Sequence, residues 1–220
     1  MNTKLFRVAL SCSLLGLVAL QGCQATGAER VDQTSTRLEE FGASIETLKG
    51  QVTAAAAALT QVVETASLDP KPAYDEFSKQ VGLVSSSAKK ARTGLEKAKS
   101  EGAKLFDDWT KRLDTITDPD IRAASEKRRN DLQEALTTVT EEAEPCLTEL
   151  EAFVVTATDL DTYLSQDLTP AGIDGISDKA ESLARSAESI NGSLDGVLET
   201  TTEVAPTFAT AKPPPPPPAD

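Results

Sequence analysis

Apolar residues recur along most of the chain in steps of three and four. An unbroken run begins at residue 38, with members Leu38, Phe41, Ile45, Leu48, Val52, Ala55, Leu59, Val62 and Ala66. Similar runs cover residues 74–116 and 121–164, and a fourth run, diluted by glycines, covers residues 173–204. This spacing is typical of helices that bury one face against one another. The pattern predicts an all-α fold built from four long helices.

Short proline-containing segments separate the four runs. They contain Asp69-Pro70, Asp118-Pro119 and Thr169-Pro170, in which the Asp or Thr can cap a helix and the proline can occupy its first turn. Short turns place long helices antiparallel, so we expect an up-down-up-down four-helix bundle over residues 33–205. In the alternative arrangement, the first or last helix swings out to pair with another molecule.

A proline also occurs inside the third run. Pro145 removes one backbone hydrogen bond, but the apolar spacing continues in phase on both sides of it. We therefore expect this proline to kink the third helix without ending it.

The first 22 residues resemble a bacterial signal peptide. A basic start with Lys4 and Arg7 precedes an uncharged apolar run over residues 8–20, which is too short to span a bilayer. The run ends in Leu20-Gln21-Gly22-Cys23, which resembles the box at which bacterial lipoproteins are cleaved and acylated. This resemblance implies removal of residues 1–22, cleavage between Gly22 and Cys23, and attachment of diacylglycerol and an acyl chain such as palmitate to Cys23.

Two alternatives concern the fate of this end of the chain. An ordinary signal peptide could instead be cut after Ala25 or Ala28, which would leave a chain without lipid. If Cys23 is lipidated, Gln24 stands where lipoproteins retained in the inner membrane often carry Asp. The resemblance therefore favours the periplasmic face of the outer membrane, with residues 23–32 as a polar, lipid-anchored leader.

The other end of the chain contains six consecutive prolines. They occupy residues 213–218, and we expect residues 206–220 to form a disordered, proline-rich tail of polyproline II character.

Composition excludes several classes of function. Residues 1–22 contain two basic and no acidic residues, so the remainder has 20 Lys and Arg against 35 Asp and Glu, a net charge of −15. Such an acidic chain is not expected to bind nucleic acid. The sequence contains no histidine, which removes the usual general base and histidine-ligated metals. We predict neither a metal nor a cofactor, and we expect Cys146, which lies on the apolar face, to be inert. A redox or dimer-crosslinking role for this thiol is the alternative.

Basic residues are concentrated around the second turn. Residues 89–129 contain twelve basic and eight acidic residues, and the possible contact patch comprises Lys111, Arg112, Arg122, Lys127, Arg128 and Arg129. In the predicted bundle this patch lies at the membrane-proximal end, where it could meet anionic lipids or cell-wall carboxylates. The favoured interpretation is that these residues pair with the acidic first and last helices. Trp109 is expected to fill the core, with a cation–π contact to Arg128 as the alternative.

One stretch also resembles a known family. The segment Lys104-Leu105-Phe106-Asp107-Asp108-Trp109, followed by Leu113, Ile116, Pro119, Asp120, Arg122, Ala124, Ser125 and Glu126, resembles an uncharacterised family of bacterial envelope proteins known as a domain of unknown function. The resemblance covers most of residues 68–200. It implies a signal or lipid-attachment box, a long helical body and a proline midway along the third helix, as Pro145 is here, but no catalytic residues.

These observations predict a non-enzymatic, lipid-anchored protein of the cell envelope that serves as a helical spacer or interaction scaffold. Expected partners are the membrane through the lipid anchor and envelope proteins or the cell wall. A homo-oligomer is an alternative, for which Phe106 and Val154-Val155 are candidate contacts. Another is a periplasmic carrier of an apolar ligand, indicated by the small residues Ala98 and Gly102, or an envelope enzyme of unrecognised type.

Overall fold

The computed structural model describes residues 27–209, and all regular structure within that range is helical. Four helices are long: α1 (Gly27–Glu64), α2 (Lys71–Leu113), α3 (Pro119–Gln166) and α5 (Ser177–Val204). A short helix, α4 (Pro170–Asp174), precedes α5, and a 3-10 turn, η1 (Ala205–Phe208), follows it. The predicted all-α bundle is confirmed.

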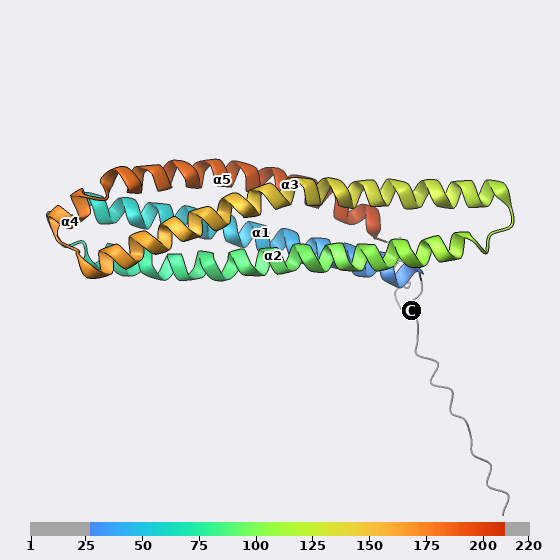
Figure 1. Ribbon diagram of the computed structural model, residues 1–220, viewed down its shortest axis with the longest axis horizontal. Coiled ribbons are helices and arrows are strands. Elements are labelled where there is room, and N and C mark those ends of the chain that lie inside the picture. The colour runs from blue at the N-terminus through green and yellow to red at the C-terminus, as the bar shows by residue number, and fades with distance from the viewer. Residues whose placement is uncertain (1–26, 210–220) are drawn as a thin grey trace, which may run out of the picture.

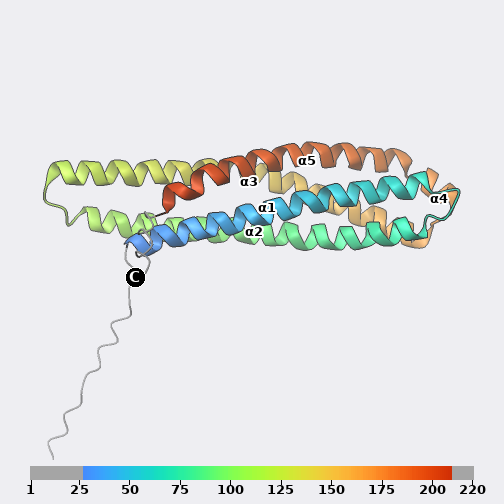
Figure 2. The same ribbon diagram turned by 180° about the vertical axis from the view of Figure 1, so that it is seen from behind.

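The four long helices run alternately up and down (Figure 1; Figure 2). α1 packs against α2 and α5, and α3 packs against the same two helices from the other side. The chain thus goes round the bundle in order, as short connections require. In this structure α1 and α5 pack together within one chain, so neither of them swings out.

The predicted apolar seams form the core. Nearly all their members on the four long helices are buried, and the largest fully buried side chains include Phe41, Phe77, Leu59, Leu95, Leu105 and Leu150. Burial of such a side chain contributes about 1.5–3 kcal/mol. Since the seam residues come from all four helices, the bundle has one continuous core.

The predicted helix starts are confirmed at two of the three turns. Asp118 adopts an extended backbone and its carboxylate accepts hydrogen bonds from the amides of Asp120 and Ile121, each at 3.0 Å. Thr169 accepts one from the Gly172 amide at 3.2 Å. At the first turn Pro70 itself occupies the cap position, so α2 begins one residue later than expected, at Lys71. The Asp69 carboxylate still accepts a hydrogen bond from the Lys71 amide at 3.2 Å.

Pro145 lies within α3, which continues through it to residue 166. Figure 1 shows α3 following the long axis over its first half and crossing the bundle obliquely over its second half. The prediction that the proline does not end the helix is confirmed.

The last predicted helix is divided into two. Thr169 starts α4, but the helix ends after five residues, and the backbone bends at Gly175 and Ile176 before α5 begins. The bend allows both Ile173 and Ile176 to be buried. In the turn that precedes α4, Gly172 lies against the Asp167 carboxylate, which a Cβ at residue 172 would approach to 2.5 Å.

The bundle extends further at both ends than the predicted range of 33–205. α1 begins at Gly27, so residues 27–32 of the expected leader are helical. At the other end Phe208, expected to lie in the disordered tail, is 0% exposed. Residues 1–26 and 210–220 lie outside the described residues, and so do Gly22, Cys23 and the six prolines.

The apolar pattern did not predict the first turns of α1, because polar residues occupy core positions there. Thr34 and Ser35 are both buried. The Thr34 hydroxyl donates to the Arg30 carbonyl at 3.0 Å, and the Ser35 hydroxyl donates to the Ala205 carbonyl of η1 at 2.8 Å. Because these hydroxyls find partners, their burial is tolerated.

Candidate functional site

The α2–α3 hairpin projects beyond the rest of the bundle. In both views the hairpin continues past the start of α1 and past η1 (Figure 1; Figure 2). We call this region, formed by the last turns of α2, the first turns of α3 and the start of α1, the hairpin end. It has fewer helices around its core than the rest of the molecule.

An apolar cleft lies at the hairpin end. Its volume is about 320 Å³, and it is lined by Gly27, Ala28, Arg30, Val31, Leu105, Asp108, Trp109, Arg112, Leu113, Ile116 and Ser125. Leu105, Trp109 and Leu113 continue the inner seam of α2, while Val31 faces them from α1. The cleft is therefore an unfilled continuation of the bundle core.

Trp109 forms part of the wall of this cleft. Its indole nitrogen donates a hydrogen bond to the Ser125 hydroxyl of α3 at 2.9 Å, which joins the two arms of the hairpin. The side chain is only partly buried, so its predicted role as a core residue holds in part. The alternative cation–π contact is not formed, because the Arg128 guanidinium donates instead to the Thr207 carbonyl of η1 at 2.7 Å.

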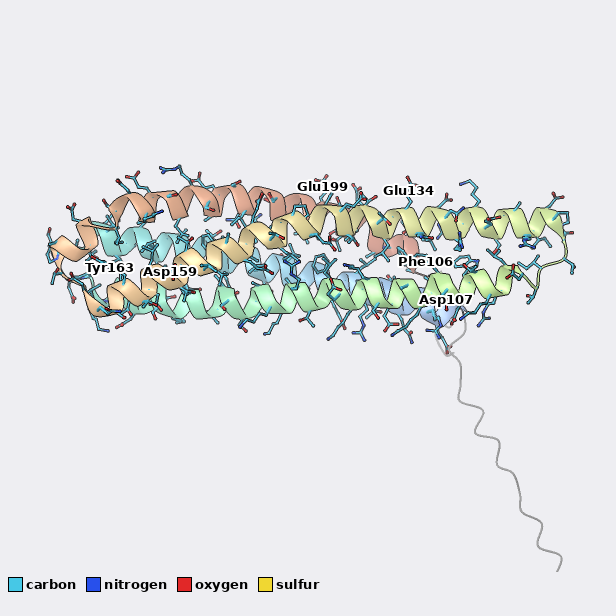
Figure 3. All side chains as sticks on the ribbon, in the orientation of Figure 1. Phe106, Asp107, Glu134, Asp159, Tyr163 and Glu199 are labelled. Carbon is cyan, nitrogen blue, oxygen red and sulfur yellow. The ribbon has the colours of Figure 1, made fainter. Side chains whose placement is uncertain are left out.

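Phe106 follows the lining residue Leu105 on α2 but belongs to the packed core. Its ring lies 6.4 Å, centroid to centroid, from that of Phe208. In Figure 3 Phe106 lies between α2 and α3, whereas the neighbouring Asp107 points away from the bundle. Phe106 is buried, so its candidacy as an exposed oligomer contact was wrong; Val155, by contrast, is 60% exposed.

The predicted basic patch is confined to the hairpin, and three of its residues form ion pairs there. Lys111 pairs with Asp107 at 2.6 Å, Arg122 pairs with Asp114 at 3.2 Å, and Lys127 pairs with Asp131 at 2.8 Å. The hydrogen bond that the Lys111 ammonium donates to Asp107, together with the negative charge of Asp107, raises the pKa of Lys111.

These partners differ from the expected ones. We expected acidic residues of the first and last helices, but each partner belongs to α2 or the adjoining turn, or to α3 itself. Residues four apart on one helix are already neighbours, and α5 ends before it reaches the patch. An ion pair between α1 and this region has the opposite polarity, because Arg30 of α1 pairs with Asp108 of α2 at 2.6 Å.

The other three patch residues make different contacts. Arg128 binds the Thr207 carbonyl, as described above, and Arg129 donates to the Thr110 hydroxyl at 2.7 Å. The Arg112 guanidinium lines the cleft and forms neither a hydrogen bond nor an ion pair with any described residue. Of the six predicted residues, Arg112 is the one whose side chain has no hydrogen-bond or ion-pair partner among the described residues.

Cys146 is buried at the interface of α3 with its neighbours and is 3% exposed. Burial, with a smaller contribution from the charge of Glu149, raises the pKa of its thiol to about 11. A thiol with so high a pKa carries little thiolate at neutral pH and is a poor nucleophile.

The acidic residues near Cys146 point to different partners. Glu144 pairs with Lys99 of α2 at 2.7 Å, and Glu142 accepts a hydrogen bond from Thr200 of α5 at 2.6 Å. The hydrogen bond from Lys99 lowers the pKa of the Glu144 carboxyl. Within residues 27–209, no three acidic or cysteine side chains gather in a way that could hold a metal ion.

The cleft residues at the start of α1 could not have been identified from the sequence. Val31 lies seven residues before Leu38, at the correct heptad distance, but Thr34 and Ser35 occupy the intervening core positions. The patch residues were predicted from their local concentration of basic charge, which is visible in the sequence itself.

The small residues that indicated a ligand cavity do not form one. Ala98 is fully buried, and a Cβ at Gly102 would lie 2.2 Å from Cδ2 of Leu136. The absence of a side chain at residue 102 thus allows α2 and α3 to approach closely. The close packing at Gly102 therefore gives no support to a widened core at this level.

Four long antiparallel helices around one apolar core define the class of the molecule as an all-helical bundle protein. The chain belongs to the DUF2959 family, described as a protein of unknown function, whose family model matches residues 20–204. The predicted membership of an uncharacterised domain family is therefore confirmed. No curated protein and no solved structure matches the chain.

Proposed function

We propose that the protein is a non-enzymatic, lipid-anchored protein of the bacterial cell envelope, whose helical bundle acts as a spacer or interaction scaffold. The carrying observation is the distance in sequence between the lipoprotein-like box at residues 20–23 and α1, which begins at Gly27. Four residues extend at most about 14 Å. A lipid on Cys23 would hold the bundle close to the membrane surface.

The hairpin end would then face the membrane. It lies at the same end of the bundle as the start of α1, and it carries the basic patch (Figure 1). Arg112 and the exposed ion pairs of the patch are suited to anionic headgroups or cell-wall carboxylates. Among the described residues no helix combines the length and apolar character needed to span a membrane. With Gln24 after the box, we place the protein at the periplasmic face of the outer membrane.

The interior of the bundle supports a scaffold more than an enzyme. Among residues 27–209 the buried polar side chains are those of Thr34, Ser35, Ser87 and Thr201. No described carboxylate or basic side chain is buried, so the core lacks the desolvated acid–base groups typical of active sites.

Intact-mass spectrometry of protein isolated from native membranes tests the anchor. We expect a mature chain that starts at Cys23 and carries diacylglyceryl and acyl groups. The Cys23→Ser variant serves as the control and should lose both the lipid mass and the membrane association. A lipid-free chain starting after Ala25 or Ala28 would contradict the proposal and indicate a protein released into the periplasm or medium.

The apolar cleft favours one second candidate, a carrier of an apolar ligand. Its volume of about 320 Å³ lies at the lower end of the range of about 300–1,000 Å³ for small-molecule pockets. The same membrane-derived protein can be examined by native mass spectrometry. A lipid that leaves on denaturation and is lost in a Leu113→Arg variant would favour the carrier. An envelope enzyme remains a third candidate, which no described feature favours.

A further inference from the structure

We propose that the proline run at residues 213–218 docks within its own chain, in the apolar cleft beside Trp109. The occupant is thus the segment that directly follows the last described residues. The proposal does not depend on lipidation of Cys23, because it concerns contacts between the C-terminal segment and the bundle.

The cleft lies at the level of the bundle that α5 and η1 do not reach. Elsewhere in the bundle α5 covers the inner faces of its neighbours α1 and α3, but it stops at Val204, and η1 continues only to Phe208. α2 and α3 extend further (Figure 1; Figure 2). Leu105, Trp109 and Leu113 consequently face a cleft of about 320 Å³.

The chain leaves the described structure beside this cleft. Phe208 packs near Phe106, and Trp109 lies three residues further along α2. On α3, Arg128 binds the Thr207 carbonyl, and Ser125, another lining residue, lies three residues before it. On both arms of the hairpin, the residue that contacts η1 therefore lies about one helical turn, ~5.4 Å, along the helix from a residue that lines the cleft.

The linking segment is long enough. Four residues, 209–212, separate η1 from the first proline and can extend about 13 Å. The six prolines span ~19 Å in the polyproline II conformation. The cleft can accommodate part of this run, with the remainder continuing toward the tip of the hairpin.

The chemistry of the two surfaces agrees. Polyproline segments bind apolar grooves that have an aromatic wall, and their preformed conformation loses little entropy on docking. The indole N–H of Trp109 is already donated to Ser125, so its ring supplies an apolar face. Contacts to the proline rings would bury this face without leaving a polar group unpaired.

Charge also favours a tail that runs from η1 toward the tip of the hairpin. Asp220 follows the proline run, and a tail running from η1 toward the tip carries its carboxylate along α2. The Arg112 guanidinium, which lacks a partner among the described residues, lies on the rim of the cleft. Attraction between these groups would decrease as the salt concentration rises.

Tethering makes weak docking sufficient. A short flexible linker gives an effective concentration in the millimolar range. A binding surface with a dissociation constant of about 1 mM would therefore be occupied about half of the time or more. This affinity is within reach of a small apolar contact.

The single tryptophan of the sequence gives a direct test. Trp109 emission and acrylamide quenching are compared in the chain from Gln24 onward, in the same chain ending at Ala209, and in a length-matched chain with serine at residues 213–218. All three retain every described residue. We expect the truncated and serine chains to emit at longer wavelength and to be quenched more strongly. A synthetic peptide of residues 209–220 should reverse the effect on the truncated chain at about millimolar concentration.

Two controls define what each outcome means. Circular dichroism must show the same helix content in the three chains, and Arg112→Ala should weaken peptide binding mainly at low salt. Emission and quenching that are identical in all three chains would overturn the proposal. A tail-dependent shift that appears only at high protein concentration, with dimers in sedimentation, would overturn the intramolecular occupant and assign the cleft to the tail of a second copy.

Discussion

Glycines in the long helices have contrasting surroundings. A Cβ at Gly102 would lie 2.2 Å from Cδ2 of Leu136, whereas a Cβ at Gly196 would meet no atom within 4 Å. The first glycine permits the close approach of α2 and α3, and the second lies on an exposed face of α5. A glycine in a helix thus has no fixed meaning until its neighbours are known.

Replacement of these two glycines by alanine is expected to have different effects. Gly196→Ala should stabilise the bundle by about 1 kcal/mol, because alanine has the higher helix propensity. Gly102→Ala gains the same propensity but overpacks Leu136, which costs about 1–3 kcal/mol. Urea unfolding monitored by circular dichroism measures both free energies. Equal stabilisation by the two substitutions would show that the α2–α3 contact relaxes without cost.

The Cys146 thiol connects stability to alkaline pH. Its pKa is raised to about 11 by burial, above the ordinary value of 9.0, so the neutral thiol is favoured in the folded state. The resulting stabilisation is fully present below pH 9 and is lost as the pH rises toward 11. We expect the difference in unfolding free energy between the natural chain and Cys146→Ala to decrease over that interval.

Unfolding in urea at a series of pH values measures this difference. Subtracting the unfolding free energies of the two proteins cancels the effect of the lysine and tyrosine titrations, which both proteins share. A difference independent of pH between 9 and 11 would contradict the assignment. Ellman's reagent at pH 8 offers a second check, because the thiol should react only after the bundle unfolds.

At the scale of elements, η1 completes the bundle where α5 ends, short of the tip of the hairpin. Phe208 is fully buried beside Phe106, and the Ser35 hydroxyl of α1 and the Arg128 guanidinium of α3 each bind a carbonyl of η1. This four-residue turn therefore contacts α1, α2 and α3. This turn positions the beginning of the C-terminal tail.

Phe208→Ala should release η1 from the bundle. Phe-to-Ala substitutions in cores cost about 3–5 kcal/mol, but a terminal element can detach locally instead of unfolding the whole molecule. We expect faster hydrogen exchange at the Ala209 amide, which is bonded to the Pro206 carbonyl at 3.0 Å, with a small change in melting temperature. Phe208→Leu is the matched control and should retain most of the protection. Unchanged exchange in the alanine variant would show that the hydrogen bonds from Ser35 and Arg128 to the carbonyls of η1 are enough to hold it on the bundle.

At the scale of the whole molecule, the bundle is a rod closed within one chain. α3 has 48 residues, which corresponds to ~72 Å. α1 and α5 are joined by an ion pair between Lys49 and Asp195 and by a hydrogen bond from the Asn191 amide to the Thr53 hydroxyl at 2.9 Å. A swung-out helix would break both contacts or form them between two molecules.

Cysteine cross-linking tests this closure. Thr53→Cys and Asn191→Cys are combined in a Cys146→Ala chain that begins at Gln24, and a short thiol-bridging reagent is added. We expect a cross-linked monomer on a denaturing gel, since both cysteines belong to one bundle. The single-cysteine variants are the controls. Cross-linked dimers from the double variant at low protein concentration would show that helices are exchanged between chains.

The sequence by itself determined the helical class, the number of long helices, the caps at Asp118 and Thr169 and the continuity of α3 through Pro145. These features depend on local periodicity and on hydrogen bonds between residues close in sequence. The family membership also followed from local motifs.

Tertiary structure alone decided where the elements end and which surfaces remain open. The burial of Phe208, the helical start at Gly27 and the pairing of the basic patch within the hairpin depend on contacts between distant residues. The cleft beside Trp109 exists because α2 and α3 extend beyond α5, and this difference in length along the bundle is visible only in the tertiary structure. Periodicity shows which face of a helix is buried, but the partner of that face is determined by packing in three dimensions.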